Sequence, residues 1–214
     1  EGPTMQDDDH HWLKHGSTAS DEVRAVYDEW ADTYDETLAS WDYRAPAEAA
    51  GMLRAELAAD AAILDAGCGT GLTGAALRAA GFTGPIDGID LSPVSLKEAR
   101  AHGVYRDLSV VDLQTLPLPI GDDAYDGVLC IGVMTYVPDG EGILREFARV
   151  VRPGGRVLIT QRDDLFRERG YAEMFDRAAD VVGDVRLSEP QPYLPGNPDF
   201  GENIKVIFAI MTVR

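Results

Sequence analysis

Cysteine is scarce in this chain, with Cys68 and Cys130 the only two among 214 residues. Two cysteines are too few for the disulfide framework that supports a small secreted domain, and each lies next to an expected core strand. We therefore expect both to be free thiols, and we expect the protein to be cytoplasmic.

Long apolar runs are also missing. No run approaches the roughly 20 apolar residues of a transmembrane helix, and the N-terminus is acidic and polar, unlike a signal peptide. We therefore expect no membrane partner. With 214 residues, 45% of them hydrophobic, the chain is long enough to bury roughly 70% of its unfolded surface as one domain.

Basic residues are few. The chain has 19 Lys and Arg against 37 Asp and Glu, a formal net charge of -18, and its basic residues form only short pairs. A phosphate backbone would be repelled, so we expect a small-molecule substrate and no nucleic acid. The charge also favours a monomer or weak dimer, and a steering role for a cationic substrate stays open beside that effect on solubility.

The most informative stretch spans residues 63–71, with the sequence ILDAGCGTG. An apolar strand here runs into a glycine-rich turn that opens a helix. Such a turn presents backbone N–H groups and a positive helix end to an anionic ligand, and its glycines allow close approach. Residues 69–74 also fit the loose G-x-G-x-x-G pattern, but Asp65 and Gly67 precede the glycine that should directly follow the strand. The turn predicts a nucleotide-type cofactor site.

Helical periodicity marks the N-terminal part of the chain. Ser20 is expected to cap a helix with acidic residues in its first turn. One face of that helix carries Val23, Val26, Tyr27, Trp30 and Tyr34. A second helix is expected to start at Pro46, in its first position, and to run to about residue 57.

Beyond residue 60, strands alternate with helices. The expected strands span residues 62–65, 86–90, 109–111, 125–131 and 156–161. The first helix between these strands is expected to end at residue 80. The second is capped by Ser92, starts at Pro93 and ends near residue 103. The third spans 142–151 and is followed by a Pro-Gly-Gly turn at 153–155. A helix over 163–182, a short strand over 184–187, a proline-rich loop over 188–202 and a strand over 204–213 complete the chain.

This alternation predicts an α/β fold with a doubly wound, mostly parallel sheet. The last two strands have no helix between them, so they should form an antiparallel hairpin at one end of the sheet. We expect a flexible segment over residues 1–20 and a single domain over 21–214, with lid helices over 21–58 and a core over 59–214.

Three segments carry a family resemblance. The run DAGCGTG at 65–71 resembles motif I of the class I S-adenosylmethionine-dependent methyltransferases, GIDLS at 88–92 resembles motif II, and VDL at 111–113 resembles motif III. Residues 144–155 are similar to the family's helix and turn before the fifth strand. The resemblance covers residues 21–214 and implies a Rossmann-like methyltransferase fold, seven strands in the order 3-2-1-4-5-7-6, and S-adenosyl-L-methionine as cofactor.

The resemblance assigns the turn residues to the methionine end of the cofactor. Asp65 would lie under that end and hold the turn. The remaining cofactor-binding residues of this segment are Gly67, Cys68, Gly69, Gly71 and Leu72. Cys68 is interpreted as a small lining residue. Cys130 and Ile131 lie where the strand over 125–131 ends, and there the family offers a backbone carbonyl to the methionine ammonium.

Asp90 is the central expected site residue, because the family uses an acidic residue at this strand end to accept both ribose hydroxyls. Charge-assisted hydrogen bonds of this kind are roughly twice as strong as neutral ones. Leu91 and Ser92 follow it along the cofactor. Asp112 would lie near the adenine amino group and Leu113 against the ring.

The N-terminal helix also resembles a family segment. Residues 27–35, YDEWADTYD, are similar to the lid of many small-molecule methyltransferases, where aromatic faces attract and shield the sulfonium. Tyr27 and Tyr34 have this role or pack the helix on the sheet. Arg44 pairs with the methionine carboxylate or lies on the surface. Residues 41–46, with 63–72, resemble the Williams-Beuren-region methyltransferase-like group.

Several reaction classes lack their residues here. There is no Asn or Asp before Pro-Pro and an aromatic, no Pro-Cys nucleophile at Cys130, and no Tyr-x-x-x-Lys of short-chain dehydrogenases. The end of the strand over 125–131 is apolar, so no metal is expected. A general base is optional, and the candidates are His10, His11, His15, Tyr136 and, on the side away from the expected acceptor, His102.

The sequence therefore predicts a methyltransferase that moves a methyl group to an O, N, S or C nucleophile of a small molecule by in-line displacement. The alternative is an S-adenosylmethionine-binding sensor or accessory protein without transfer, and a nicotinamide oxidoreductase is third. The acceptor itself is not identified by any motif.

Overall fold

The computed structural model describes residues 12–13, 16–201 and 203–214. Its centre is one mixed sheet in the order β3-β2-β1-β4-β5-β8-β6, with β7 paired to β8. The strands are β1 (Ile63–Ala66), β2 (Ile86–Asp90), β3 (Asp107–Val110), β4 (Tyr125–Cys130), β5 (Val151–Arg162), β6 (Val182–Leu187), β7 (Gln191–Pro192) and β8 (Lys205–Val213).

The predicted strand order is confirmed, since the strand expected as the seventh in the chain is β8. Strands β1 to β5 are parallel to one another, and β8 runs antiparallel to both β5 and β6. The expected terminal hairpin therefore closes the sheet. The additional strand β7 has only two residues, 191 and 192, inside the segment that was expected to be a loop.

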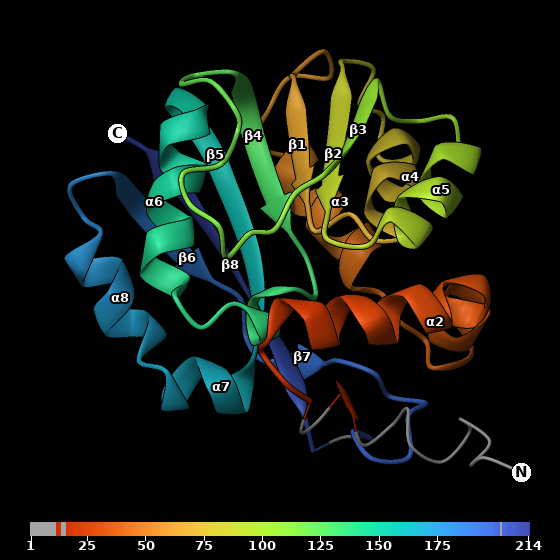
Figure 1. Cartoon of the computed structure of the whole chain (residues 1–214). Coiled ribbons are helices and arrows are strands. Elements are labelled where there is room, and N and C mark those ends of the chain that lie inside the picture. The colour runs from red at the N-terminus through yellow and green to blue at the C-terminus, as the bar shows by residue number, and fades with distance from the viewer. Residues whose placement is uncertain (1–11, 14–15, 202) are drawn as a thin grey trace, which may run out of the picture.

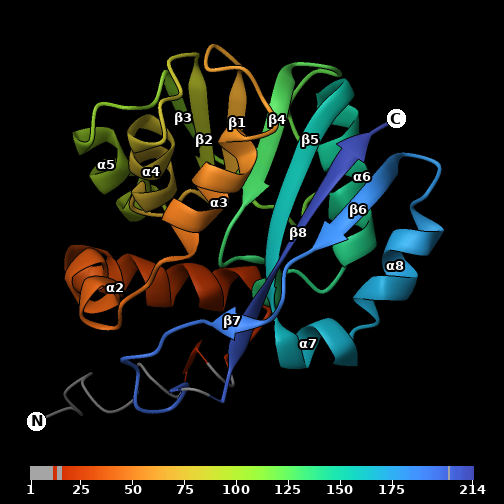
Figure 2. The same ribbon diagram turned by 180° about the vertical axis from the view of Figure 1, so that it is seen from behind.

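Helices cover both faces of the sheet. They are α2 (Ser20–Ser40), α3 (Ala45–Arg54), α4 (Leu72–Ala79), α5 (Pro93–Ala101), α6 (Gly140–Val150), α7 (Asp163–Glu168) and α8 (Tyr171–Arg177), with a 3-10 turn, η1, at Met134–Tyr136. Figures 1 and 2 show α6 on one face and α3 on the other. Helix α2 crosses the molecule beneath the ends at which the parallel strands finish (Figure 1).

The core is divided between the two faces because side chains alternate along a strand. Leu64 of β1 packs in the cluster that contains α6 and α8, whereas its neighbour Ile63 packs in the cluster that contains α3 and the end of α4. Strand β1 pairs with β2 on one side and β4 on the other, so its polar end at Asp65 lies at the middle of the sheet.

Three local expectations were wrong. Ser20 is the first residue of α2 and not its cap, because Ala19 holds that position and its N–H bonds Ser17 Oγ at 2.9 Å. The helix expected over 163–182 is broken into α7 and α8 at Gly170, which has a left-handed φ of 60°. The turn at 153–155 lies within β5, which begins at Val151.

Both cysteines are free and buried, as expected. Within the described ranges, the structure contains no helix with the length and apolar character needed to cross a bilayer.

Candidate cofactor and active site

A cavity of about 110 Å³ lies between α2 and the carboxyl ends of the central strands. This is where doubly wound sheets bind ligands, since the helices that follow β1 and β4 leave to opposite faces. The predicted residues that line it are Tyr27, Tyr34, Gly67, Cys68, Gly69, Leu72, Asp90, Leu91, Ser92, Asp112, Leu113 and Ile131. Segments far apart in the sequence thus meet around one space.

The glycine turn forms the floor of this cavity. Gly67, Gly69 and Gly71 all have left-handed φ angles, of 73°, 50° and 100°, which side chains disfavour. At Gly67 a Cβ atom would lie 2.4 Å from the Val133 side chain, so this position also needs glycine for space. The turn is fixed to β2 by hydrogen bonds from the N–H groups of Gly67 and Cys68 to the Ile89 carbonyl, at 2.8 and 3.0 Å.

Asp90 connects the glycine turn with the end of β2. One carboxylate oxygen accepts the Gly69 N–H at 2.8 Å, and the other accepts the Ser92 N–H at 2.8 Å. Burial raises the pKa of Asp90, while these backbone bonds oppose the rise. Each carboxylate oxygen can accept a second hydrogen bond, so Asp90, which lines the cavity, has the capacity to bind two ligand hydroxyls.

Asp65 lies behind the cavity wall and not in its lining. Its side chain belongs to a residue only 1% exposed, and it accepts a hydrogen bond from the Tyr105 hydroxyl at 2.6 Å. Burial is the largest influence on Asp65 and raises its pKa to about 7. Cys130 and Gly71 are likewise absent from the lining, the former fully buried and the latter at the N-cap of α4.

The side of the cavity near β3 contains Asp112 and Leu113 together with a residue that carried no sequence signal. Gln114 donates through its side-chain amide to the carbonyls of Tyr136, at 3.0 Å, and Thr18, at 2.7 Å. Its own N–H bonds Asp112 at 2.8 Å. Gln114 therefore links the expected adenine side of the cavity to η1 and to the segment that precedes α2.

Acidic side chains of helix α2 bind the glycine turn and the loop that follows β2. Asp35 accepts the Thr70 hydroxyl at 2.5 Å and lies 3.8 Å from the His102 ring, while Asp28 accepts the Ser92 hydroxyl. The Ser92 oxygen also accepts the Ser95 N–H and caps α5, as the sequence predicted. These contacts hold α2 against the glycine turn. Both aspartates belong to the lid segment over residues 27–35, but no contact was predicted for either of them.

Arg44 does not reach the cavity. Its side chain is 70% exposed and pairs with Asp42, and the structure keeps it apart from the other predicted site residues. Arg44 and Asp42 are only two residues apart in the sequence, which favours this local ion pair. The arginine that does line the cavity is Arg24 of α2. Of the candidate bases, His10, His11 and His15 lie outside the described residues.

A second, smaller cavity adjoins the first. Both cavities are lined by Tyr27, Tyr34, Tyr43, Gly132 and Tyr136. The second is also lined by Leu13, Leu38, Thr135, Arg162, Tyr193, Leu194 and Phe200. Tyr136, a candidate base, therefore lies between the two cavities. Tyr43, Tyr193 and Arg162 were not among the predicted site residues.

Among the residues that the structure describes, no three His, Cys, Asp or Glu side chains lie close enough together to bind a metal ion.

Comparison with known proteins agrees with this geometry. Residues 64–159 match the family model of a methyltransferase domain. Methyltransferase-like protein 27 of Homo sapiens is 40% identical over 141 residues, which are 64% of this chain and 56% of that protein. Ubiquinone biosynthesis O-methyltransferase of Xanthomonas oryzae pv. oryzae is 35% identical over 109 residues, 48% of this chain and 43% of that protein. The chain spans about half the length of these curated relatives.

A solved structure shows the same fold. The complex between the Haloferax volcanii Trm112 methyltransferase activator and a methyltransferase matches with a TM-score of 0.67 at 20% identity, over 89% of this chain and 96% of that chain. The strand order, the glycine turn and the sequence matches together support a class I S-adenosylmethionine-dependent methyltransferase, and the match to the methyltransferase-domain family itself covers residues 64–159.

Proposed function

We propose that this chain binds S-adenosylmethionine in the larger cavity and transfers its methyl group to an O, N, S or C nucleophile of a small molecule. The observation that carries the proposal is the position of Asp90, which lines the cavity between the glycine turn and β2. In this arrangement Asp90 accepts the ribose hydroxyls, and Asp112 and Leu113 hold the adenine. The bound cofactor supplies a methyl group on an already activated sulfonium.

The chain's own contribution is positioning. Alignment of a nucleophile with a reacting carbon can supply roughly 7 to 11 kcal/mol of the barrier. Gly67 and Ile131 border the cavity at the carboxyl ends of β1 and β4, and the rings of Tyr27 and Tyr34 cover it from α2. Aromatic faces attract a sulfonium and keep water from it.

The enclosure supports a small acceptor. Helix α2 is attached over the cofactor loops by Asp28 and Asp35, and the acidic net charge of -18 opposes nucleic acid. The Xanthomonas relative is named for ubiquinone biosynthesis. Although the haloarchaeal neighbour is in complex with an activator protein, we propose a monomer or weak dimer that acts alone.

The test is formation of S-adenosylhomocysteine from S-adenosylmethionine, measured by mass spectrometry with a panel of small O, N, S and C nucleophiles. We expect methyl transfer to at least one panel member, and loss of transfer in Asp90→Ala. Cofactor binding with no transfer to any member would favour the sensor or accessory alternative.

A further inference from the structure

Four tyrosine hydroxyls gather in two pairs where the two cavities meet. The hydroxyls of Tyr27 and Tyr136 are 2.8 Å apart and hydrogen-bonded. Tyr43 and Tyr193 form the second pair, with their ring centroids 5.8 Å apart. These residues come from α2, the segment before α3, η1 and the segment after β7, so only the folded chain brings them together.

Gly132 opens the wall toward the second pair. A Cβ atom at this position would lie 2.8 Å from the Tyr43 hydroxyl oxygen and 3.3 Å from that of Tyr193. Gly132 follows β4, has a left-handed φ of 74° and lines both cavities. The absence of a side chain at residue 132 therefore leaves the two hydroxyls facing the junction.

The protons of these hydroxyls can be counted. Each pair has two hydroxyl protons, and the hydrogen bond between Tyr27 and Tyr136 uses one proton of the first pair. Burial raises the pKa of Tyr27, Tyr43, Tyr136 and Tyr193, so all four remain protonated near neutral pH. At least one proton of each pair can then be donated to a ligand, which suits an oxygen anion that accepts two hydrogen bonds.

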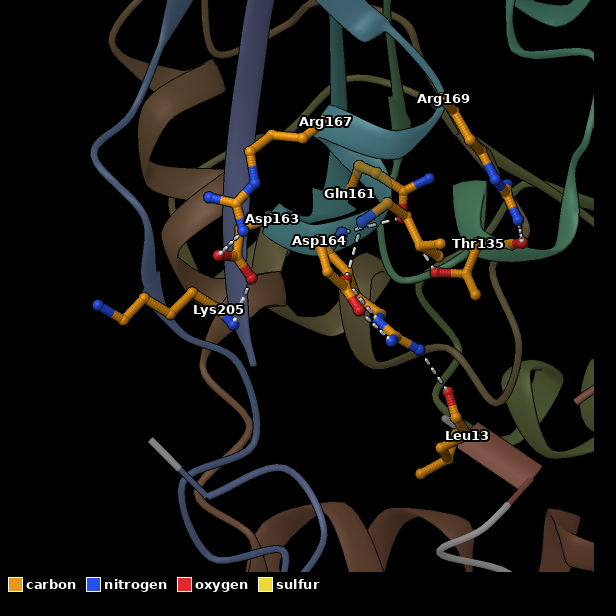
Figure 3. A network of polar contacts seen from close by, with 10 residues as sticks. Leu13, Thr135, Gln161, Asp163, Asp164, Arg167, Arg169 and Lys205 are labelled. Carbon is orange, nitrogen blue, oxygen red and sulfur yellow. Dashed lines mark hydrogen bonds and ion pairs between the residues drawn. The ribbon is translucent and has the colours of Figure 1, made fainter. Parts of the chain in front are cut away.

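The rest of the smaller cavity is consistent with an anion. The Arg162 guanidinium lines it with a side chain 5% exposed, donating to Asp164 at 3.1 Å and to the Leu13 carbonyl at 3.0 Å. Figure 3 shows Asp164 and Leu13 as members of the same network of polar contacts. Of the described residues that line this cavity, none is Asp, Glu, His, Lys or Cys.

That composition restricts the acceptor. An aliphatic alcohol or a protonated amine is a poor nucleophile unless a base takes its proton, and the described lining of the smaller cavity offers no carboxylate or imidazole for that purpose. An acceptor that is already an anion near neutral pH needs donors, and donors are what this junction contains.

Size places the acceptor at the junction. The smaller cavity has a volume of about 20 Å³, room for about one or two water-sized groups. It accommodates the oxygen end of an acceptor but not a whole ring. The remainder has to lie against the rings of Tyr27, Tyr34, Tyr43 and Tyr136, which border both cavities and favour a flat aromatic partner.

On the basis of the proposed function, we infer that the methyl acceptor is a flat aromatic compound with an acidic hydroxyl, bound as its phenolate between the two tyrosine pairs. The hydroxyl loses its proton to water before transfer. The phenolate oxygen then forms a bond to the methyl carbon as the carbon–sulfur bond breaks, and the bonding electron pair remains on sulfur.

The test uses 4-nitrophenol, whose anion absorbs visible light, with protein saturated with S-adenosylhomocysteine. We expect the bound probe to ionise at a pH at least about one unit lower than in water, a tenfold stabilisation of the anion that corresponds to one charged hydrogen bond. Nitrobenzene, which has the ring without the hydroxyl, should bind about tenfold more weakly or worse. Benzyltrimethylammonium should not displace the probe.

Two variants test the hydroxyls without removing their rings. Tyr43→Phe and Tyr27→Phe should each reverse the pKa shift of the bound probe by about one unit. Tyr125→Phe is the matched control, because its hydroxyl bonds Asp87 at 2.8 Å and lines neither cavity. This control should bind the probe as the wild type does.

Each result decides the inference. A bound probe with an unshifted pKa, an equal affinity for nitrobenzene, or displacement by the ammonium compound overturns the phenolate acceptor. Calorimetry with S-adenosylhomocysteine alone separates the two proposals. If that ligand binds and the probe does not, only the acceptor class is wrong, whereas failure of that ligand to bind removes the proposed function and the inference with it.

Discussion

The Tyr105 hydroxyl donates a 2.6 Å hydrogen bond to the carboxylate of Asp65 and accepts the Gly74 N–H at 3.1 Å. Space for this side chain comes from two glycines. A Cβ atom at Gly74 would lie 2.4 Å from Tyr105, and one at Gly88 would lie 3.0 Å from its ring. Gly74, the third glycine of the loose G-x-G-x-x-G pattern, therefore leaves room for Tyr105 to reach the Asp65 carboxylate behind the glycine turn.

Asp65 should make the stability of the protein depend on pH. Its pKa rises from 3.8 to about 7 in the folded state because burial disfavours the charged form. The folded state therefore keeps a proton that the unfolded chain loses, and the contribution of Asp65 to stability is lost as pH rises from 3.8 to about 7, by about 1.4 kcal/mol per pH unit.

We expect Asp65→Asn to abolish this contribution while its amide oxygen still accepts the Tyr105 hydrogen bond. The measurement is urea unfolding of both proteins between about pH 4 and 8. The unfolding free energy of wild type should fall relative to that of the variant up to about pH 7 and run parallel above it. Parallel curves over the whole range would show that Asp65 is ionised throughout.

Tyr105→Phe should weaken cofactor binding through Asp65. The Tyr105 hydrogen bond opposes the rise in the Asp65 pKa, so its loss raises that pKa further and leaves less carboxylate near pH 7. We expect the loss of unfolding free energy to be about 1 to 3 kcal/mol, since Asp65 and the Gly74 N–H both lose a partner.

The distinguishing readout for Tyr105 is calorimetric affinity for S-adenosylmethionine against pH. Because the cofactor is cationic, binding should tighten as Asp65 ionises, and the midpoint of that profile should move to higher pH in Tyr105→Phe. Tyr125→Phe serves as control, as its hydroxyl bonds Asp87. A destabilised variant with an unmoved midpoint would assign Tyr105 to packing alone.

Asp90→Ala should weaken binding of S-adenosylhomocysteine about 10- to 100-fold, corresponding to about 1.5 to 3 kcal/mol for hydrogen bonds to a charged group. The variant also releases the Gly69 and Ser92 N–H groups, so Asp90→Asn is needed as a milder second variant. Asp107→Asn, at an exposed carboxylate on β3, is the control. An unchanged calorimetric affinity would remove Asp90 from the site.

The attachment of α2 predicts its exchange behaviour. We expect hydrogen exchange over residues 20–40 to slow when S-adenosylhomocysteine binds, because segments that close over ligands come from the low-stability end of a structure. Asp28→Asn with Asp35→Asn should speed exchange in the free protein about 5- to 10-fold, as two hydroxyl bonds weaken.

Asp21→Asn on the same helix provides the control for that experiment. The Asp21 side chain is 91% exposed, and it forms an ion pair with Arg24 of α2. Equal exchange with and without ligand would make α2 a permanent part of the core and would return Tyr27 and Tyr34 to a packing role.

The parts of the fold that sequence predicted are those with local causes. The turn over residues 67–71 needs glycines for its left-handed φ angles, and the Ser92-Pro93 start of α5 depends on its own cap, so both are visible in the chain. The break at Gly170 was missed because a single glycine is tolerated inside a helical pattern, so the sequence does not reveal that its φ is left-handed.

Long-range contacts explain what the sequence could not predict about the site. Tyr105 is 40 residues from Asp65, and Asp35 is 35 residues from Thr70, so neither pairing leaves a spacing to recognise. Arg44 was expected at the cofactor from its neighbours alone, and the nearby Asp42 pairs with it instead.

The central claim is that the cavity between α2 and the strand ends binds S-adenosylmethionine. Its most direct test is a crystal structure of the protein with S-adenosylhomocysteine. We predict that the two ribose hydroxyls lie within hydrogen-bond distance of the Asp90 carboxylate, with the adenine beside Asp112 and Leu113. A ligand bound elsewhere, or a protein that binds NAD in this cavity and not S-adenosylhomocysteine, would contradict the account.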